Sequence, residues 1–245
     1  MAYILPKDKQ IAVISALSEG SSIRAVERMT GIHRDTIMRL GVRIGQGCAK
    51  IHDQKMRDLP CRKLQLDEIW GFVGKKQKHI TEADDENKVG DAWTFCAIDA
   101  DTKLVPSFRV GKRNSMTANA FAADLANRLK NRVQLSTDGL KAYVDAIELA
   151  FGANVDYGQI VKSFEADNGA ATPERRYSPP DIVSIKKNIL MGEPIFSQIS
   201  TSYVERLNAT TRCHMRRLTR LTLAFSKKWE NFEEEVIHAI SDVIQ

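Results

Sequence analysis

Three carboxylates stand at places in the sequence where a negative charge is either costly to bury or well placed for chemistry. Asp67 interrupts the apolar stretch LQLDEIW, Asp138 follows the apolar run QLST, and Glu205 directly precedes the most basic segment of the chain. A charge within an apolar strand is costly to bury unless it is paired or holds a metal. Carboxylate oxygens are the ligands that hard cations such as Mg²⁺ prefer. The three residues are therefore candidate metal ligands.

The chemistry that suits such a site is phosphoryl transfer. Two divalent cations about 4 Å apart can activate an attacking oxygen and stabilise the leaving oxygen of an in-line displacement at phosphorus. Mg²⁺, or Mn²⁺ in its place, accepts one or two carboxylates and completes its shell with water and phosphate oxygens. We expect two such ions at Asp67, Asp138 and Glu205.

Each carboxylate also has a structural explanation. Asp67 and its neighbour Glu68 could lie at a solvated strand end, and alternation does not choose between them in a strand that is apolar on both faces. Asp138 begins an Asp-Gly pair, which is common in turns, and Asp is a good helix N-cap. Glu205 could bond to the backbone of Ser202 in a capping box. Only the combination of the three favours a metal site.

A purely basic segment follows Glu205. Residues 206–228 contain no acidic residue and carry Arg206, Arg212, Arg216, Arg217, Arg220, Lys227 and Lys228. Arginines bind DNA phosphates, and such contacts position a protein on a duplex without reading its sequence. The formal net charge of +5 also favours a polyanionic partner. We predict backbone contacts from the five arginines Arg206, Arg212, Arg216, Arg217 and Arg220.

The carboxylates need a scaffold that brings them together, and the chain beyond residue 62 has the pattern of a mixed α/β fold. Apolar, β-branched and aromatic runs predict strands at 63–74, 92–98, 104–111, 132–137 and 155–165. Amphipathic patterns predict helices at 115–131, 139–152, 200–218 and 226–244, and Pro and Gly mark an insertion at 166–199. Three meandering strands followed by strand–helix alternation are the element order of the ribonuclease-H-like fold. Asp138 would then lie at the carboxyl end of a strand, where open sheets collect ligands.

The N-terminal residues predict a separate all-helical unit. Apolar periodicity indicates helices at 7–20, 21–31 and 33–45. Two short helices joined at a glycine, the second of them rich in arginine, are typical of a helix-turn-helix that binds DNA. We predict DNA contacts from Arg34, Thr36 and Arg39. The alternative is a plain three-helix bundle whose arginines face water.

The overall composition limits the class of protein. With 43% hydrophobic and 27% charged residues among 245, it is typical of a soluble globular protein. No apolar run approaches the roughly 18 residues of a membrane helix, and the first residues lack the pattern of a signal peptide. Four scattered cysteines argue against a zinc ribbon and a disulfide framework. We expect a cytoplasmic protein with a helix-turn-helix domain at 1–50, a linker at 51–62 and a catalytic domain at 63–245.

At the residues that carry these signals the chain resembles the DDE transposases of bacterial insertion sequences, specifically the insertion-sequence-one family. The similar stretches are LDEIWGFVGKKQK, GDAWTFCAIDADTKLVPSFRVG, NRVQLSTDGLKAYVDAIELAFG and ISTSYVERLNATTRCHMRRLTRLTLAFSKKWEN, with SIRAVERMTGIHRDTIMRL resembling the family's helix-turn-helix. Together they cover most of the chain. The resemblance implies a ribonuclease-H-like catalytic domain whose acidic triad is Asp67, Asp138 and Glu205, with Asp67 chosen over Glu68.

The resemblance also implies a reaction and its partners. Metal-assisted hydrolysis at the element ends would free a 3′-hydroxyl, which then attacks a phosphodiester of the target DNA. Double-stranded DNA and further copies of the chain are the implied partners, in the bacterial cytoplasm at the nucleoid. Two other functions fit the sequence. One is a non-enzymatic helix-turn-helix regulator, and the other is a ribonuclease-H-like nuclease such as a resolvase, which would cut but not join.

Overall fold

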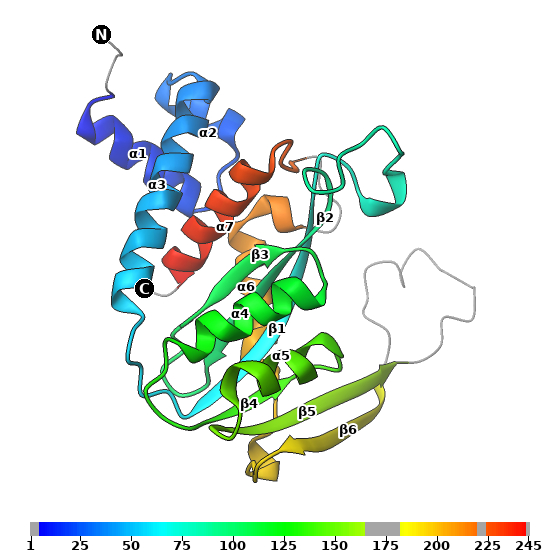
Figure 1. Cartoon of the computed structure of the whole chain (residues 1–245). Coiled ribbons are helices and arrows are strands. Elements are labelled where there is room, and N and C mark those ends of the chain that lie inside the picture. The colour runs from blue at the N-terminus through cyan, green and yellow to red at the C-terminus, as the bar shows by residue number, and fades with distance from the viewer. Residues whose placement is uncertain (1–4, 165–181, 220–223, 244–245) are drawn as a thin grey trace.

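A mixed six-stranded sheet forms the centre of the molecule in the computed structural model, which describes residues 5–164, 182–219 and 224–243 (Figure 1). Its strands are β1 (Lys63–Val73), β2 (Gly90–Asp99), β3 (Phe108–Gly111), β4 (Val133–Thr137), β5 (Val155–Phe164) and β6 (Ile182–Met191). They are arranged in the order β3-β2-β1-β4-β5-β6. β1, β2 and β3 form an antiparallel meander, β4 and β5 continue from β1 in parallel, and β6 returns antiparallel to β5.

Helices cover both faces of this sheet, which explains why β1 is apolar on both sides. On one face α4 (Ser115–Ala126) and α5 (Ala142–Phe151) pack on the strands around Phe95, Phe121 and Tyr143. On the other face α6 (Ser202–His214) and α7 (Trp229–Val243) pack on Ile69 and Cys96. Short 3₁₀ turns lie at Gln77–His79, Phe196–Gln198 and Arg216–Leu218. The fold is therefore a layered α/β arrangement around β1.

One strand lies inside the insertion predicted at 166–199. β6 falls within residues 166–199 and pairs along β5 as the edge of the sheet. Its sequence IVSIKKNILM has the β-branched residues of a strand, but its apolar side chains do not alternate with polar ones because both faces of the edge are largely exposed. Residues 165–181 of the predicted insertion lie outside the described part of the chain.

Three N-terminal helices form a third hydrophobic cluster and pack against α7. They are α1 (Lys7–Ser18), α2 (Ile23–Thr30) and α3 (Arg34–Lys55), with a core that includes Val13, Val26 and Ile37. α3 runs on to Lys55, so the linker predicted at 51–62 begins inside a helix. The close approach of α3 to α7 depends on Gly45, since a Cβ at this residue would lie 2.5 Å from the backbone oxygen of Glu234.

Among the described helices, none combines the length and the apolar character that crossing a bilayer requires.

Candidate active site

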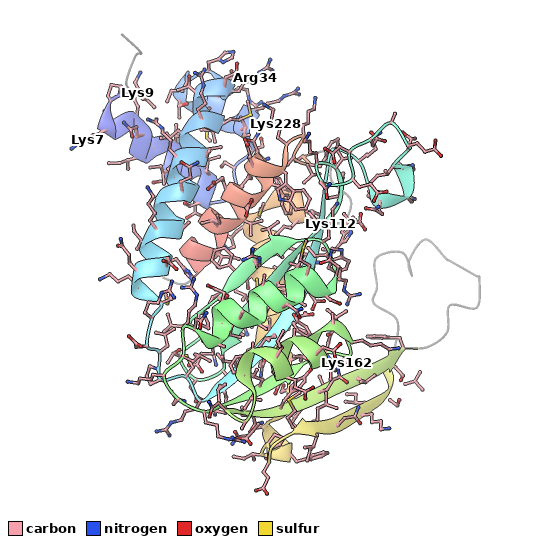
Figure 2. The ribbon with its side chains drawn as sticks, in the orientation of Figure 1. Lys7, Lys9, Arg34, Lys112, Lys162 and Lys228 are labelled. Atoms are coloured by element: carbon pink, nitrogen blue, oxygen red, sulfur yellow. The ribbon has the colours of Figure 1, made fainter. Side chains whose placement is uncertain are left out.

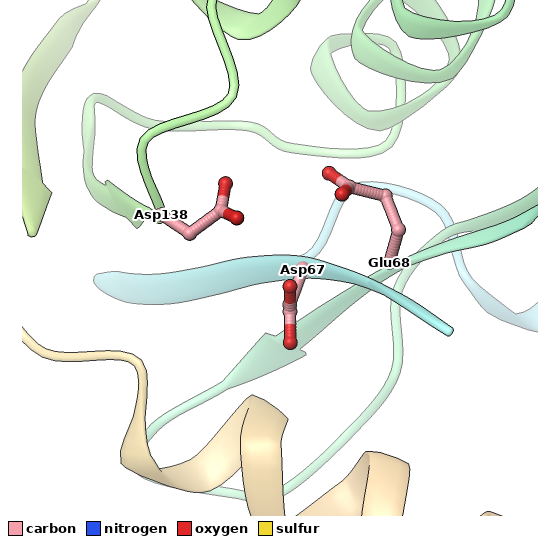
Figure 3. A group of neighbouring side chains, drawn as sticks. All are labelled: Asp67, Glu68 and Asp138. Carbon is pink, nitrogen blue, oxygen red and sulfur yellow. The ribbon is translucent and has the colours of Figure 1, made fainter. Parts of the chain in front are cut away.

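The two aspartates converge because β1 and β4 run in parallel and their pairing stops beside both residues. The last paired residues are Leu66 on β1 and Thr137 on β4. Asp67 and Asp138 are the next residues along the two strands, so they lie at the same level of the sheet. One ligand oxygen from each of Asp67, Glu68 and Asp138 lies within 4.8 Å of the other two (Figure 3).

Glu68 joins the aspartates from the opposite side of β1. Figure 3 shows Asp67 and Glu68 pointing to opposite sides of the strand, with Asp138 beside it. The side chain of Glu68 is 1% exposed and pairs with Arg113, whose Nη2 lies 3.2 Å from Oε2. The same Nη2 lies 3.9 Å from Oδ2 of Asp138. The sequence leaves Asp67 and Glu68 as alternatives, whereas the structure brings both to the site.

Helix α6 forms another wall of the carboxylate pocket, and the side chain of Gln65 on β1 fixes the first turn of this helix. Gln65 Oε1 accepts hydrogen bonds from the backbone N–H groups of Tyr203 at 2.7 Å and Val204 at 3.2 Å. One turn further on, the Asn208 amide donates to Asp67, with Nδ2 at 2.7 Å from Oδ2. Glu205 lies three residues before Asn208 and therefore shares its face of the helix.

Glu205 lines the same pocket as the close carboxylate group but is not a member of it. Its Oε1 accepts a hydrogen bond from Thr201 Oγ1 at 2.6 Å and forms an ion pair with Lys162 of β5. The capping box with Ser202 is not formed, because the Ser202 N–H donates to Ser200 Oγ at 3.2 Å instead. Glu205 is thus held at the edge of the pocket by one hydroxyl and one lysine.

Burial and mutual repulsion make the close carboxylates hard to ionise. Burial is the largest cause that raises the pKa of Asp67 to about 6, with the negative charges of Asp138 and Glu205 adding to it and the Asn208 amide opposing it. Burial and the charge of Asp138 raise the pKa of Glu68 to about 7, against the Tyr143 hydroxyl and Arg113. Negative charge in this pocket is therefore only partly compensated by the protein.

The residues present fit a hard divalent cation. All the close ligand atoms are carboxylate oxygens, and three groups spaced within 4.8 Å can share an ion. Oδ1 of Asn208 is also buried without a hydrogen-bond partner among the described residues. A buried acceptor of this kind is costly unless a donor or a cation reaches it. The donor set therefore suits a hard divalent cation.

The predicted phosphate contacts of the basic segment fall into two groups. Arg206 and Arg216 are exposed, and Arg212 lines the carboxylate pocket while its Nε donates to the Leu218 carbonyl at 3.3 Å. Arg217 is turned inward, where it pairs with Glu235 and donates to Ser226 Oγ. Arg220 lies outside the described residues.

The predicted contacts of the helical domain lie apart from the carboxylates. Arg34 and Arg39 are exposed in the first turns of α3, and Thr36 is half-buried. The backbone N–H of Arg34 donates to Glu27 Oε1 at 3.0 Å, which ties the start of α3 to α2. Figure 2 shows Arg34 near the top of the molecule and Lys162, which lines the carboxylate pocket, well below it.

Three site residues have only weak signals in the sequence or none. Asn208 could have been found from its position one helical turn after Glu205. Arg113 precedes α4 and Lys162 lies on β5, and nothing in the local pattern of either segment points to a carboxylate partner. Both contacts depend on the packing of distant elements.

No protein-family model and no curated protein matches the sequence. Among the solved structures that are similar to the chain in part are two transposase complexes. One is the cryo-EM structure of a piggyBac transposase synaptic complex with hairpin DNA, at 11% identity and a TM-score of 0.48, covering 98% of this chain and 66% of that one. The other is the Mos1 transposase paired-end complex with left transposon end, at 12% identity and a TM-score of 0.26, covering 64% of this chain and 60% of that one. The chain thus spans less than two thirds of either.

Proposed function

We propose that this chain is a DDE-type DNA transposase of a bacterial insertion sequence. The observation that carries the proposal is the meeting of Asp67 and Asp138 at the end of the β1–β4 pairing, with Glu205 of α6 on the wall of the same pocket. Three carboxylates from distant parts of the chain, beside an arginine-bearing helix, suit metal-dependent cleavage of a phosphodiester.

The strand order supports a ribonuclease-H-like catalytic domain. An antiparallel meander of β1 to β3 followed by parallel β4 and β5 matches the element order expected of that fold. This order makes β4 the neighbour of β1, so Asp67 in the middle of β1 and Asp138 just after β4 would both supply ligands. The short turn between α2 and α3, with Gly31 in the left-handed conformation at φ 68°, supports a helix-turn-helix at the N-terminus.

Each site residue then has a role in binding or positioning. Asp67 and Asp138 would hold two ions, Glu205 would complete the shell of one of them, and Asn208 orients the Asp67 carboxylate. When bound, the ions would activate the attacking oxygen and stabilise the leaving oxygen. Arg113 pairs with Glu68 and Asp138, and Lys162 pairs with Glu205; both cations would turn to DNA phosphates when a metal ion replaces them.

The DNA would follow the exposed arginines. Arg206, Arg212 and Arg216 lie on or just after α6 and can bind the backbone beside the cleavage site, while Arg34, Thr36 and Arg39 contact a separate part of the duplex from α3. Bringing two element ends together would require at least a second copy of the chain. We place this reaction in the bacterial cytoplasm, at the nucleoid.

A non-enzymatic DNA-binding regulator is the second candidate. It is favoured by one observation, namely that protein cations already pair with the site carboxylates, Arg113 with Glu68 and Asp138, and Lys162 with Glu205. A regulator would bind DNA equally well with and without Mg²⁺ and would tolerate loss of the carboxylates.

The decisive experiment is a cleavage and joining assay on DNA that carries the sequences flanking this gene. We expect Mg²⁺- or Mn²⁺-dependent nicking and transfer of the new 3′-hydroxyl into a second DNA. Asp138→Asn should abolish both while DNA binding is kept, and Asp145→Asn, an exposed aspartate of α5, should change neither. Nicking that survives Asp138→Asn would refute the catalytic assignment, and nicking without joining would indicate a nuclease.

A further inference from the structure

Two tryptophans line the carboxylate pocket without a role in the proposed chemistry. Trp70 of β1 and Trp93 of β2 are directly opposite each other in the antiparallel pairing. Both are half-exposed and border the pocket that contains Asp67, Glu68 and Asp138. The other apolar side chains of the lining come from β5 and β6, so the two rings are the large apolar groups of β1 and β2 beside the carboxylates.

The rings lie immediately beside the carboxylates. Glu68 and Trp70 are two residues apart on β1, so their side chains leave the same face of the sheet about 7 Å apart. Arg113 links the two features, because its guanidinium pairs with Glu68 and lies 4.7 Å from the centre of the Trp93 ring. A nucleotide next to a phosphodiester at the carboxylates would have its base within reach of these rings.

Cations lie over both rings, and Trp93 also packs in part against the core cluster around Phe95. Besides Arg113 on Trp93, the Lys76 ammonium lies 5.5 Å from the Trp70 ring centre and 5.6 Å from that of Phe72. Stacking of a nucleobase on an aromatic ring is stronger than the attraction of a cation to an exposed ring, so a base can displace the cation, which then remains available for a phosphate.

We infer that Trp70 and Trp93 form a stacking site for an unpaired nucleobase next to the scissile phosphodiester, with Arg113 and Lys76 binding the flanking phosphates. The base must be unpaired because, within a duplex, its faces are stacked on its neighbours and do not reach a ring at the wall of a pocket. The placement of the scissile bond rests on the proposed function, whereas the preference for unpaired bases is measured without it.

The test compares single-stranded and duplex DNA in EDTA, so that no cleavage consumes the probe. A fluorescent oligothymidine of about 12 nucleotides, within the range of known single-strand sites, and a duplex of equal length are titrated at one fixed salt concentration. Trp70→Leu and Trp93→Leu should weaken binding of the single strand about 5- to 100-fold and change duplex binding less than about twofold. Trp70→Phe, which keeps a ring, should fall between wild type and Trp70→Leu.

The third tryptophan provides a matched control. Trp229 at the start of α7 is also half-exposed beneath a lysine, with Lys112 Nζ 5.1 Å from its ring centre, but it does not border the carboxylate pocket. Trp229→Leu should leave both affinities unchanged. A single strand of abasic sites should bind wild type as weakly as oligothymidine binds Trp70→Leu.

Equal affinity for the abasic and thymidine strands, or equal losses for single strand and duplex, would overturn the stacking site. If metal-dependent cleavage persists in that case, the proposed function stands and only this inference fails. If cleavage is absent while the single-strand preference depends on Trp70 and Trp93, the stacking site stands and the proposed function fails.

Discussion

The Asn208 amide of α6 lies 2.7 Å from the Asp67 carboxylate of β1, measured from Nδ2 to Oδ2, and so joins the helix to the sheet at the candidate metal site. Both side chains are largely shielded from solvent, so neither can exchange this contact for water without cost. The hydrogen bond fixes the orientation of Asp67 and opposes the rise in its pKa.

We therefore expect Asn208→Leu to lower the free energy of unfolding by about 1–3 kcal/mol, because it leaves a buried carboxylate without its donor. Asn208→Asp should also destabilise the metal-free protein, since it adds a carboxylate beside Asp67, but added Mg²⁺ should stabilise it more than wild type. Urea unfolding with and without Mg²⁺ measures both effects. Asn87→Asp, at an exposed loop position, serves as the control, and equal Mg²⁺ stabilisation of the two Asp variants would contradict the metal site.

The raised carboxylate pKa values predict how stability depends on pH. Asp67 and Glu68 titrate near 6 and 7 when folded, above their ordinary values of 3.8 and 4.5. The folded state therefore holds protons that the unfolded state releases, and the stability of the metal-free protein should fall as pH rises from about 4 to about 7. A cation favours the ionised carboxylates, so Mg²⁺ should raise the melting temperature more at about pH 8 than at about pH 5.

Thermal unfolding across this pH range, with Mg²⁺ and with EDTA, shows whether the stability of the metal-free protein falls or rises with pH. In the Asp67→Asn, Glu68→Gln double variant this part of the pH dependence should disappear together with the Mg²⁺ effect. If the metal-free wild type and this double variant show the same pH dependence between about pH 5 and pH 7, the two carboxylates do not hold protons in the fold above their ordinary pKa values.

Lys162 competes with a cation for Glu205. Because the two side chains form an ion pair, a metal that uses Glu205 must first displace the lysine. Lys162→Met should therefore lower the Mg²⁺ concentration for half-maximal cleavage by roughly two- to tenfold, which is the effect expected when an ion pair near the protein surface no longer competes with the metal. Lys186→Met changes an exposed lysine on neighbouring β6 and controls for the loss of one positive charge. Identical metal requirements in the two variants would place Glu205 outside the metal shell.

The sequence predicts the scaffold of the site better than its contacts. The strands that carry Asp67 and Asp138 are visible because their apolar runs end in a turn or continue into aromatic residues, which are local signals. The choice between Asp67 and Glu68 is not local. Asp67 and Glu68 point to opposite sides of β1, and Asp138 lies beside that strand, close to both of them. Only the pairing of β1 with β4 brings Asp138 to this place.

Contacts made by long side chains were not predictable for a related reason. Arg113 and Lys162 reach the carboxylates from elements that are distant in sequence. The residues around an arginine do not show whether its side chain faces solvent or pairs with a buried carboxylate. Arg217 shows the converse, since it belongs to the basic segment but pairs with Glu235 of α7. The edge strand β6 was not predicted because Pro and Gly residues on both sides of it indicate turns.

Arg216 and Arg217 are adjacent in sequence and should differ in function. The side chain of Arg217 is 11% exposed and is held by Glu235 and Ser226, so Arg217→Met should cost about 1.5–3 kcal/mol of unfolding free energy, as for hydrogen bonds to charged groups. Arg216 is exposed, so Arg216→Met should change stability by less than about 0.5 kcal/mol. If Arg216 binds a DNA phosphate, Arg216→Met should reduce the slope of log DNA affinity against log salt concentration by about 1. Urea unfolding and DNA titrations at several salt concentrations separate the two roles. A salt slope that changes only in Arg217→Met would mean that Arg217 leaves Glu235 and binds the DNA backbone.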